Sequence, residues 1–277
     1  MKKSSPLKKG VFYIIIFIVV FVYLFPFIYV ILTSIRPTDE IFSPIFSLFP
    51  KKIITTHYVS AITVYPTIKL ISNSLLVSLP VVVFSILLAL PGGYAFARYQ
   101  FRLKKLLFLS IIILRFIPLI PILIPLFIFM DSLGLVDTIV GLIIAHTAFK
   151  IPFAVWMLKI FINDLPKEID ESAKIDGASM FTILFKIILP LVGPGITAIA
   201  IMNFLETWND FTVALILTHT LDARTLPVGL SQFMAEYQID WGPLNAASTL
   251  ALAPLLIFAI FAERYLMKGL TLGAVKG

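Results

Sequence analysis

Residues 11–33 read VFYIIIFIVVFVYLFPFIYVILT, an apolar run without a charged side chain. As a helix rising about 1.5 Å per residue, it covers the roughly 30 Å of hydrocarbon in a lipid bilayer. Lys2, Lys3, Lys8 and Lys9 precede it, but the run is too long for a signal peptide and no small-residue cleavage site follows. We therefore interpret it as an uncleaved membrane anchor after a basic segment at residues 1–10.

The composition supports a lipid environment for the whole chain. Hydrophobic residues make up 60% of the 277 residues and charged residues 13%, with 25 Phe. A soluble core of this size cannot bury so much apolar surface, whereas lipid can solvate it. The net charge of +7 lies at the ends of apolar runs, which indicates membrane topology rather than nucleic-acid binding. The absence of Cys excludes disulfides, thiolate catalysis and Cys-ligated metals.

Further apolar runs of similar length predict an all-α, polytopic membrane protein with six transmembrane helices. They are expected near residues 11–33, 71–97, 106–130, 138–160, 191–217 and 247–267, in a single transmembrane domain over residues 11–277. Pro91-Gly92-Gly93 is expected to break the second helix, and prolines punctuate the third at Pro118, Pro121 and Pro125. Such breaks fit either a packed bundle around a cavity or simple kinks.

The basic residues orient the chain. With the N-terminus in the cytoplasm, 15 Lys and Arg residues lie on the cytoplasmic side and 5 on the outer side, and the opposite orientation reverses this bias. The positive-inside rule therefore places both termini in the cytoplasm. Residues 163–190 and the tail at 268–277 then face the cytoplasm, whereas residues 34–70 and 218–246 face outside.

The cytoplasmic segment at residues 163–190 has the pattern of a helix, a turn and a second helix. Asp164 and Pro166 are typical of a helix N-terminus. The first helix is expected at residues 165–175, with an apolar ridge at four-residue spacing formed by Leu165, Ile169 and Ala173. On its other side, i,i+4 ion pairs are expected between Lys167 and Glu171 and between Asp170 and Lys174.

Gly177 is suited to the left-handed conformation that ends a helix, and Ser179 to capping the next one. The first helix carries more acidic than basic side chains. Amphipathic helices that rest on anionic lipid are usually basic, so this balance favours a groove in a partner protein.

The stretch Glu171-Ser-Ala-Lys-Ile-Asp-Gly177, followed nine residues later by Ile187-Ile-Leu-Pro190, resembles the EAA loop of permease subunits of ABC importers. Ser172 stands where that family usually has alanine. Two further stretches, Trp208-Asn-Asp-Phe211 and Thr225-Leu-Pro-Val-Gly229, and the tail from Lys268 to Gly277 resemble the carbohydrate-uptake branch, in particular the shorter permease of maltose-type systems. The resemblance extends from about residue 70 to the end.

This resemblance implies the type I ABC importer permease fold in the cytoplasmic membrane. The implied partners are a second, similar permease, a dimer of cytoplasmic ATPases that bind ATP and Mg²⁺, an extracytoplasmic sugar-binding protein and membrane lipid.

The resemblance further implies that a coupling helix at residues 165–175 docks in an ATPase cleft, with contacts from Leu165, Ile169, Glu171, Ser172, Ala173, Asp176 and Gly177. The tail residues Gly269, Gly273 and Lys276 would reach the ATPase dimer interface; the alternative is a frayed basic terminus beside anionic lipid. The implied cargo is a disaccharide or short oligosaccharide, with glycerol phosphate and monosaccharides as alternatives.

Catalytic motifs are missing from the sequence. No phosphate-binding loop of the form G-x-x-x-x-G-K-[ST] occurs, so the chain is not expected to hydrolyse ATP by itself. The sequence has no HExxH, GxSxG or metal-ligand cluster, and its three His are scattered. We therefore expect neither an enzyme nor a bound cofactor or metal.

Four charged residues lie well inside the expected spans, away from their ends: Arg115, Lys150, Glu206 and Asp210. Each costs roughly 2.5–3.5 kcal/mol or more when it faces lipid, so ion pairs or a water-filled cavity are expected. Glu206 and Asp210 share one helix face, and His146 and Lys150 share another. Our hypothesis is that these two faces pair.

Two interpretations of this region stay open. Glu206, Trp208, Asn209 and Asp210 would either line a polar pathway or join helices as structural contacts. A rival function is an ion-coupled secondary carrier with Glu206 and Asp210 as proton or sodium sites. Such carriers often have more spans and inverted repeats, and the rival leaves residues 163–190 without a role.

Overall fold

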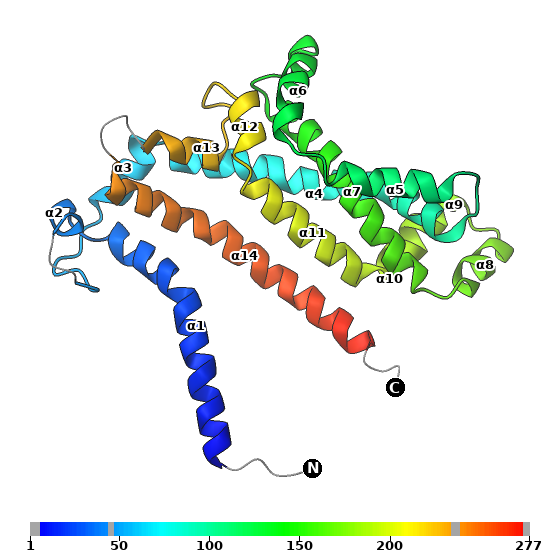
Figure 1. Ribbon diagram of the computed structural model, residues 1–277, viewed down its shortest axis with the longest axis horizontal. Helices are drawn as coiled ribbons and strands as arrows, with labels where there is room; N and C mark the ends of the chain where they lie inside the picture. The colour runs from blue at the N-terminus through cyan, green and yellow to red at the C-terminus, as the bar shows by residue number, and fades with distance from the viewer. Residues whose placement is uncertain (1–5, 44–46, 234–238, 274–277) are drawn as a thin grey trace. The chain divides into compact units, whose positions relative to one another are not determined.

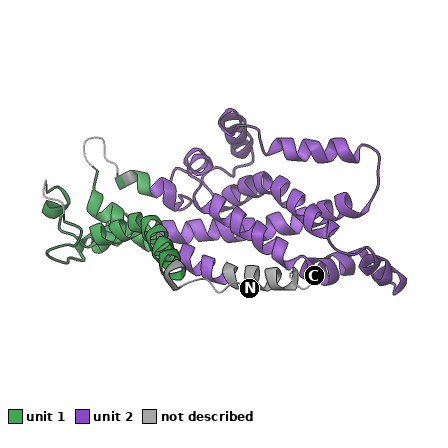
Figure 2. Ribbon diagram, turned by 60° about the horizontal axis from the view of Figure 1, so that its bottom comes forward, with its two compact units in different colours: residues 1–67, 230–253 green, residues 68–229, 254–277 purple. Residues whose placement is uncertain are grey.

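The computed structural model describes residues 6–43, 47–233 and 239–273 (Figure 1). Helices carry nearly all the regular structure in these ranges, in agreement with the predicted all-α class. The chain forms two compact units (Figure 2): unit 1 comprises residues 1–67 and 230–253, and unit 2 comprises residues 68–229 and 254–277.

Unit 1 contains α1 (Pro6–Ser34), α2 (Thr38–Ile41), α3 (Thr56–Thr63) and the first part of α14 (Trp241–Gly273). The side chains of α1 from Val11 to Phe25 are exposed all round, as expected for a helix that lies in lipid. The small core is built from Ala61, Phe233, Ala246 and Ala247. Tyr65 stacks on Phe233 with 3.8 Å between the ring centroids and donates a hydrogen bond to Asp240.

Unit 2 is organised around α7 (Ile139–Asn163), which packs against α5 (Lys104–Leu114), α11 (Gly193–Trp208) and α12 (Thr212–Leu217). The long helix α4 (Thr67–Arg98) and the shorter α6 (Ile120–Ser132) and α13 (Leu226–Leu230) complete this helical framework. Residues of α4, α6, α7, α12 and α13 share one apolar core: Val77, Val81, Leu123, Met130, Leu142, Ala145, Val213, Ala214, Leu217 and Val228.

Between α7 and α11 the chain forms several short helices. These are α8 (Glu168–Ile175), α9 (Met180–Thr182), a π-helix at Ile183–Ile188 and α10 (Leu189–Leu191). Beyond Leu191 the direction changes: the helical run Met180–Leu191 and α11 meet at 81°. Gly193 and Pro194 open α11, and proline at the start of a helix does not need the N–H that it lacks.

The described residues hold four helices long and apolar enough to cross a membrane, or five if the bent pair counts as one span. Six were predicted. The expected third helix at 106–130 is divided, because α5 ends at Leu114 and α6 begins at Ile120. Pro118 disfavours helical geometry in the residue before it and has no N–H to donate, which explains a stop between the two helices. The expected fifth helix is also divided, since α11 ends at Trp208.

The expected break at Pro91-Gly92-Gly93 is wrong. α4 runs without interruption through these residues to Arg98. The glycines serve contact with α7: a Cβ on Gly93 would lie 2.7 Å from the Cβ of Leu158 and 3.3 Å from the backbone nitrogen of Lys159. Small residues at such positions let membrane helices approach closely.

Three hydrogen bonds of Asp137 join the loop before α7 to the end of α12 and the loop after it. Asp137, in a left-handed conformation with φ of 58°, donates its N–H to the carbonyl of Leu217 at 2.7 Å. Its carboxylate accepts the N–H groups of His219 at 2.8 Å and Thr220 at 2.9 Å. Burial by itself would raise the pKa of Asp137, but these two donors outweigh it and hold the pKa below its ordinary value.

We predict that Gly93→Ala lowers the free energy of unfolding by about 1–3 kcal/mol, because the added methyl group forces α4 away from α7. Gly92→Ala is the matched control, because its Cβ would meet Val155 Cγ2 at 3.4 Å, an ordinary contact. Alanine favours helix more than glycine does, so this variant should gain up to about 1 kcal/mol in the free energy of unfolding. Thermal unfolding of both variants in detergent measures the difference. Equal melting temperatures would contradict the close packing of α4 on α7.

Candidate functional site

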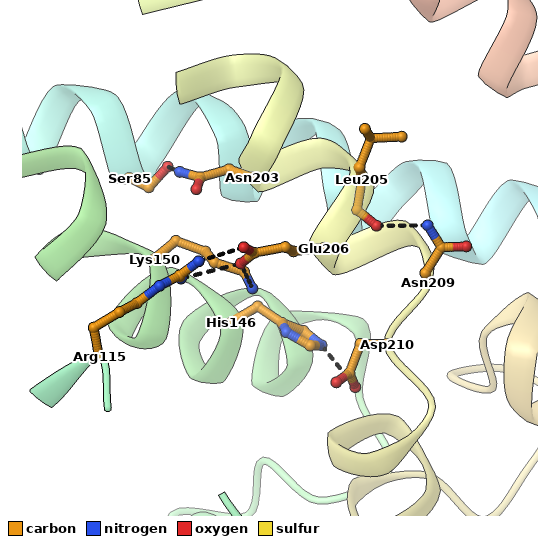
Figure 3. Close-up of polar contacts among 9 residues, drawn as sticks. All are labelled: Ser85, Arg115, His146, Lys150, Asn203, Leu205, Glu206, Asn209 and Asp210. Carbon is orange, nitrogen blue, oxygen red and sulfur yellow. Dashed lines mark hydrogen bonds and ion pairs between the residues drawn. The ribbon is translucent and has the colours of Figure 1, made fainter. Parts of the chain in front are cut away.

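One carboxylate of α11 receives two cations (Figure 3). Glu206 lies in the last turn of α11, Lys150 in the middle of α7, and Arg115 directly after α5. Arg115 donates two hydrogen bonds to Glu206: Nη1 to Oε2 at 3.1 Å, and Nη2 to Oε1. Lys150 Nζ donates to Oε2 at 2.8 Å. Glu206 therefore binds Arg115 in the two-pronged geometry that guanidinium groups favour, and it also balances Lys150.

This ion-pair cluster is largely shielded from solvent. The side chain of Lys150 is 11% exposed, that of Glu206 29% and that of Arg115 30%. The Arg115 guanidinium also lies 5.0 Å from the centre of the Phe153 ring, a cation–π distance. In such a setting each charge needs its partner, because an unpaired ion in a low-dielectric environment is costly.

One helical turn away, a second acid faces α7. Asp210 Oδ1 accepts the N–H of Val213 at 3.0 Å and of Ala214 at 3.3 Å, so it caps the start of α12. The same oxygen lies 3.8 Å from Nε2 of the buried His146 on α7. The structure thus brings Glu206 and Asp210 opposite Lys150 and His146, the two faces that the sequence marks.

A cavity of about 170 Å³ adjoins these residues. Its polar lining comes from Arg115, His146, Lys150 and Asp210, and its apolar lining from Leu114, Ile117, Leu119, Ile122, Phe149 and Val213. Trp208 is buried and stacks on Phe204, with 5.7 Å between the ring centroids. Asn209 is exposed and donates to the carbonyl of Leu205 in its own helix. Neither Trp208 nor Asn209 is among the residues that line this cavity.

A second polar contact between helices was missed by sequence reasoning. The amide of Asn203 on α11 donates to Ser85 Oγ on α4 at 2.8 Å (Figure 3). Asn203 is fully buried. A polar residue in an apolar helix, three residues before Glu206, is the signal that could have indicated it.

The expected coupling segment forms a helix and a sharp turn. α8 begins at Glu168 rather than at residue 165, and Asp164 does not cap it, because Lys167 occupies the capping position without a side-chain bond. At the other end Gly177 has φ of +77°, as predicted. Its N–H bonds the carbonyl of Lys174, and that of Ala178 bonds the carbonyl of Ala173, which is the Schellman pattern. Ser179 caps the next helix through the N–H of Thr182, as also predicted.

The expected surface pair of Asp170 with Lys174 is wrong. Asp170 is buried and accepts a hydrogen bond from Nε of Arg98, the last residue of α4. The same guanidinium donates from Nη2 to the carbonyl of Leu165 at 3.1 Å. Tyr94 Oη lies 3.5 Å from the Asp170 carboxylate. Arg98 therefore binds both α8 and the segment that precedes it, because a planar guanidinium group can donate to several acceptors at once.

The two sides of α8 differ in exposure. Ala173 is buried, and Leu165 and Ile169 are partly buried, so the predicted apolar ridge faces its own chain. Glu171, Ser172, Asp176 and Gly177 are exposed. Ile175 is 86% exposed and is the apolar side chain that the sequence-based choice of contact residues omitted. Gly269 and Gly273 lie near the end of α14, and Lys276 lies outside the described residues.

Comparison with solved structures defines the class of fold. The chain is similar to a chain in the crystal structure of a bacterial ABC transporter involved in the import of the acidic polysaccharide alginate, with a TM-score of 0.81 over 96% of this chain and 99% of that chain, at 20% identity. The chain therefore shares the fold of a component of an ABC importer.

Sequence comparisons agree with this class. The chain belongs to the family of binding-protein-dependent transport system inner membrane components, whose family model matches residues 82–271. It is 36% identical to the arabinooligosaccharides transport system permease protein AraQ of Halalkalibacterium halodurans, over 90% of this chain and 89% of that protein. It is 31% identical to the diacetylchitobiose uptake system permease protein DasC of Streptomyces coelicolor, over 90% of each.

Family membership establishes the general role. The chain is a multi-pass protein of the cytoplasmic membrane and a permease component, not an enzyme. Separate ATPase subunits hydrolyse ATP, and a substrate-binding protein delivers the cargo. The family gives no support to an ion-coupled secondary carrier.

We predict that Glu206→Gln lowers the free energy of unfolding by about 2 kcal/mol, because Arg115 and Lys150 then lack a counter-charge. The loss should stay below the 3–5 kcal/mol of fully buried pairs, since Glu206 is 29% exposed. Adding Lys150→Met to Glu206→Gln should cost less than Lys150→Met alone, and a double-mutant cycle by thermal unfolding measures this coupling. Asn209→Ala, directly after α11, serves as the control, and additive losses would contradict the ion pair.

Arg98→Gln should free α8 from α4, because Asp170 would remain as an unpaired acid and leave its buried position. We expect trypsin to cleave after Lys167 or Lys174 about tenfold faster or more in this variant. The exposed Arg102, changed to Gln, provides the control. Cleavage at the wild-type rate in Arg98→Gln would show that α8 is held by other contacts.

Proposed function

We propose that this chain is one of two permease subunits of an ATP-driven importer for a disaccharide or short oligosaccharide. The arabino-oligosaccharide and diacetylchitobiose systems to which its relatives belong support a cargo of this class. Both termini and α8 lie in the cytoplasm in this proposal, as the placement of the basic residues indicates. A second, similar permease completes the pathway, and the two alternate between inward-open and outward-open states.

The single observation that carries the coupling role is the exposed face of α8. Glu171, Ser172 and Ile175 are exposed together on α8, and Asp176 and Gly177 are exposed in the turn that ends it. The opposite side of α8 is held by its own chain. In our proposal the exposed face docks in a cleft of the ATPase, with Ile175 buried on contact and Glu171 paired with a basic group. A helix-in-groove contact of this kind takes its affinity from one apolar anchor and its orientation from charge.

Arg98 connects α8 mechanically to the end of α4. Because the guanidinium binds Asp170 and the carbonyl of Leu165, a displacement of α8 pulls directly on the end of α4. Nucleotide-driven closure of the ATPases would thus move α4 and its close neighbour α7. In our proposal the C-terminal tail reaches the interface between the two ATPase subunits, with contacts from Gly269, Gly273 and Lys276.

The ion-pair cluster takes a structural role in this proposal. Glu206 is engaged by two cations, which leaves it poorly suited to bind a transported proton or sodium ion. Asp210 and His146 border the cavity, where carboxylate and imidazole groups suit hydrogen bonds to sugar hydroxyls or to water. We infer that Glu206 joins the helices and that Asp210 contributes to the polar lining of the pathway.

We predict that Glu171→Lys removes the ATPase from the complex. In mild detergent, the tagged wild-type chain should recover an ATPase and a second permease, as identified by mass spectrometry. The variant should recover the second permease but at least about tenfold less ATPase, because a reversed charge at a protein contact costs 1.4 kcal/mol or more. Vesicles with the variant should lose ATP-dependent sugar uptake to the same extent.

The matched control is Asp131→Lys, which reverses an exposed carboxylate on α6, at the opposite side of the membrane in our topology. It should keep the ATPase. Recovery of the wild-type chain alone, or equal ATPase recovery with Glu171→Lys, would overturn the coupling role. Uptake driven by an ion gradient without ATP would overturn the importer.

A further inference from the structure

A basic pocket lies at the ends of two neighbouring helices, apart from the ion-pair cluster and from the exposed face of α8. It has a volume of about 270 Å³ and is lined by Gln100, Lys104, Lys105, Phe108 and Lys159. Lys104 and Lys105 open α5, and Lys159 lies one turn before the end of α7, which packs against α5. The pocket therefore lies where apolar helices meet a polar chain segment.

Its lining carries three lysines, one amide and no carboxylate among the residues that form it. The lysine heads are held in different ways: Lys104 Nζ donates to the carbonyl of Tyr99 at 2.8 Å, and Lys159 Nζ lies 3.8 Å from the centre of the Phe108 ring. Neither contact neutralises the positive charge. The start of α5 adds to it, because Leu103 caps the helix without a side-chain bond and the N-terminus of a helix is positive.

The surface next to the pocket is apolar. Leu106, Leu107, Leu109 and Ile113 on α5 are 47–57% exposed, and they continue from the lysines along the helix. Phe108 itself packs on Phe96 of α4, with 5.3 Å between the ring centroids. A cationic, hydrogen-bonding head region followed by an exposed aliphatic face matches the two halves of a phospholipid.

We propose that this pocket binds the headgroup of an anionic phospholipid, with its acyl chains along the exposed face of α5. The recognised chemistry is a phosphate diester: lysine ammonium groups act as point charges toward its oxygens, and Gln100 adds an amide donor. A lipid rather than soluble phosphate is the occupant, because an aliphatic surface continues from the pocket. By the charge distribution of the chain the site faces the cytoplasmic leaflet, where anionic lipids attract basic groups.

The bound lipid would brace the helix ends that carry α8. Tyr99, whose carbonyl holds Lys104, directly follows Arg98, and its ring lies 5.8 Å from Nζ of Lys174 on α8. The headgroup site thus begins at Gln100, two residues along the chain from the Arg98 contact that fixes α8. Lipid binding itself does not rest on the proposed transport function, so the two can be tested separately.

Fluorescence anisotropy of labelled phosphatidylglycerol, titrated with the full-length chain and its co-purifying subunits in detergent, tests the site. The triple variant Lys104→Gln, Lys105→Gln, Lys159→Gln should bind the lipid more weakly by roughly fivefold for each lysine, on the order of a hundredfold in all. Lys159→Arg should bind within about twofold of wild type, because it keeps the charge and the stacking on Phe108.

The matched control neutralises three exposed lysines of the other predicted face, two in the loop before α3 and one in the first turn of α4: Lys51→Gln, Lys52→Gln, Lys69→Gln. It should bind phosphatidylglycerol like wild type. Equal binding by the two triple variants, or equal affinity of wild type for labelled phosphatidylcholine, would overturn the site. Displacement of the lipid by millimolar inorganic phosphate would overturn the assignment to a lipid. ATPase recovery from the control preparations reports on the proposed function independently.

Discussion

One carboxylate with two cations joins three apolar helices of this chain. Glu206 brings the end of α5, the middle of α7 and the last turn of α11 to a single point. In lipid no water replaces a missing partner, so the three helices must assemble in one arrangement for all three charges to be satisfied. Apolar packing among Leu, Ile and Phe side chains does not discriminate so sharply between arrangements, because lipid is as good a neighbour as another helix.

A similar pairing acts at α8, the proposed coupling helix. Arg98 binds Asp170 behind α8 and leaves the opposite face of that helix exposed. The helix is therefore fixed to the membrane domain through polar contacts, although it is only eight residues long and would not be stable alone. The ion-pair cluster and the attachment of α8 thus both depend on charges that pair over long sequence distances.

Local signals predicted the local features. The helical class, the left-handed turn at Gly177 and the cap at Ser179 follow from residue types whose preferences act within a few residues. Partners distant in sequence were not predictable in this way. Asp170 was assigned to Lys174 by i,i+4 spacing, whereas its partner Arg98 lies 72 residues upstream. The break expected at Gly92 and Gly93 ignored their packing against α7, and the cost of charge in lipid marked Arg115, Lys150 and Glu206 without giving their geometry.

The π-helix at Ile183–Ile188 has a consequence for how rotation passes along the chain. A π turn contains more residues than an α turn, so its conversion to α geometry shifts the register of everything on one side by one residue. A shift of one residue turns a helix by about 100° and advances it by about 1.5 Å. This segment lies between α8 and the 81° bend before α11, so such a conversion would rotate one of them relative to the other.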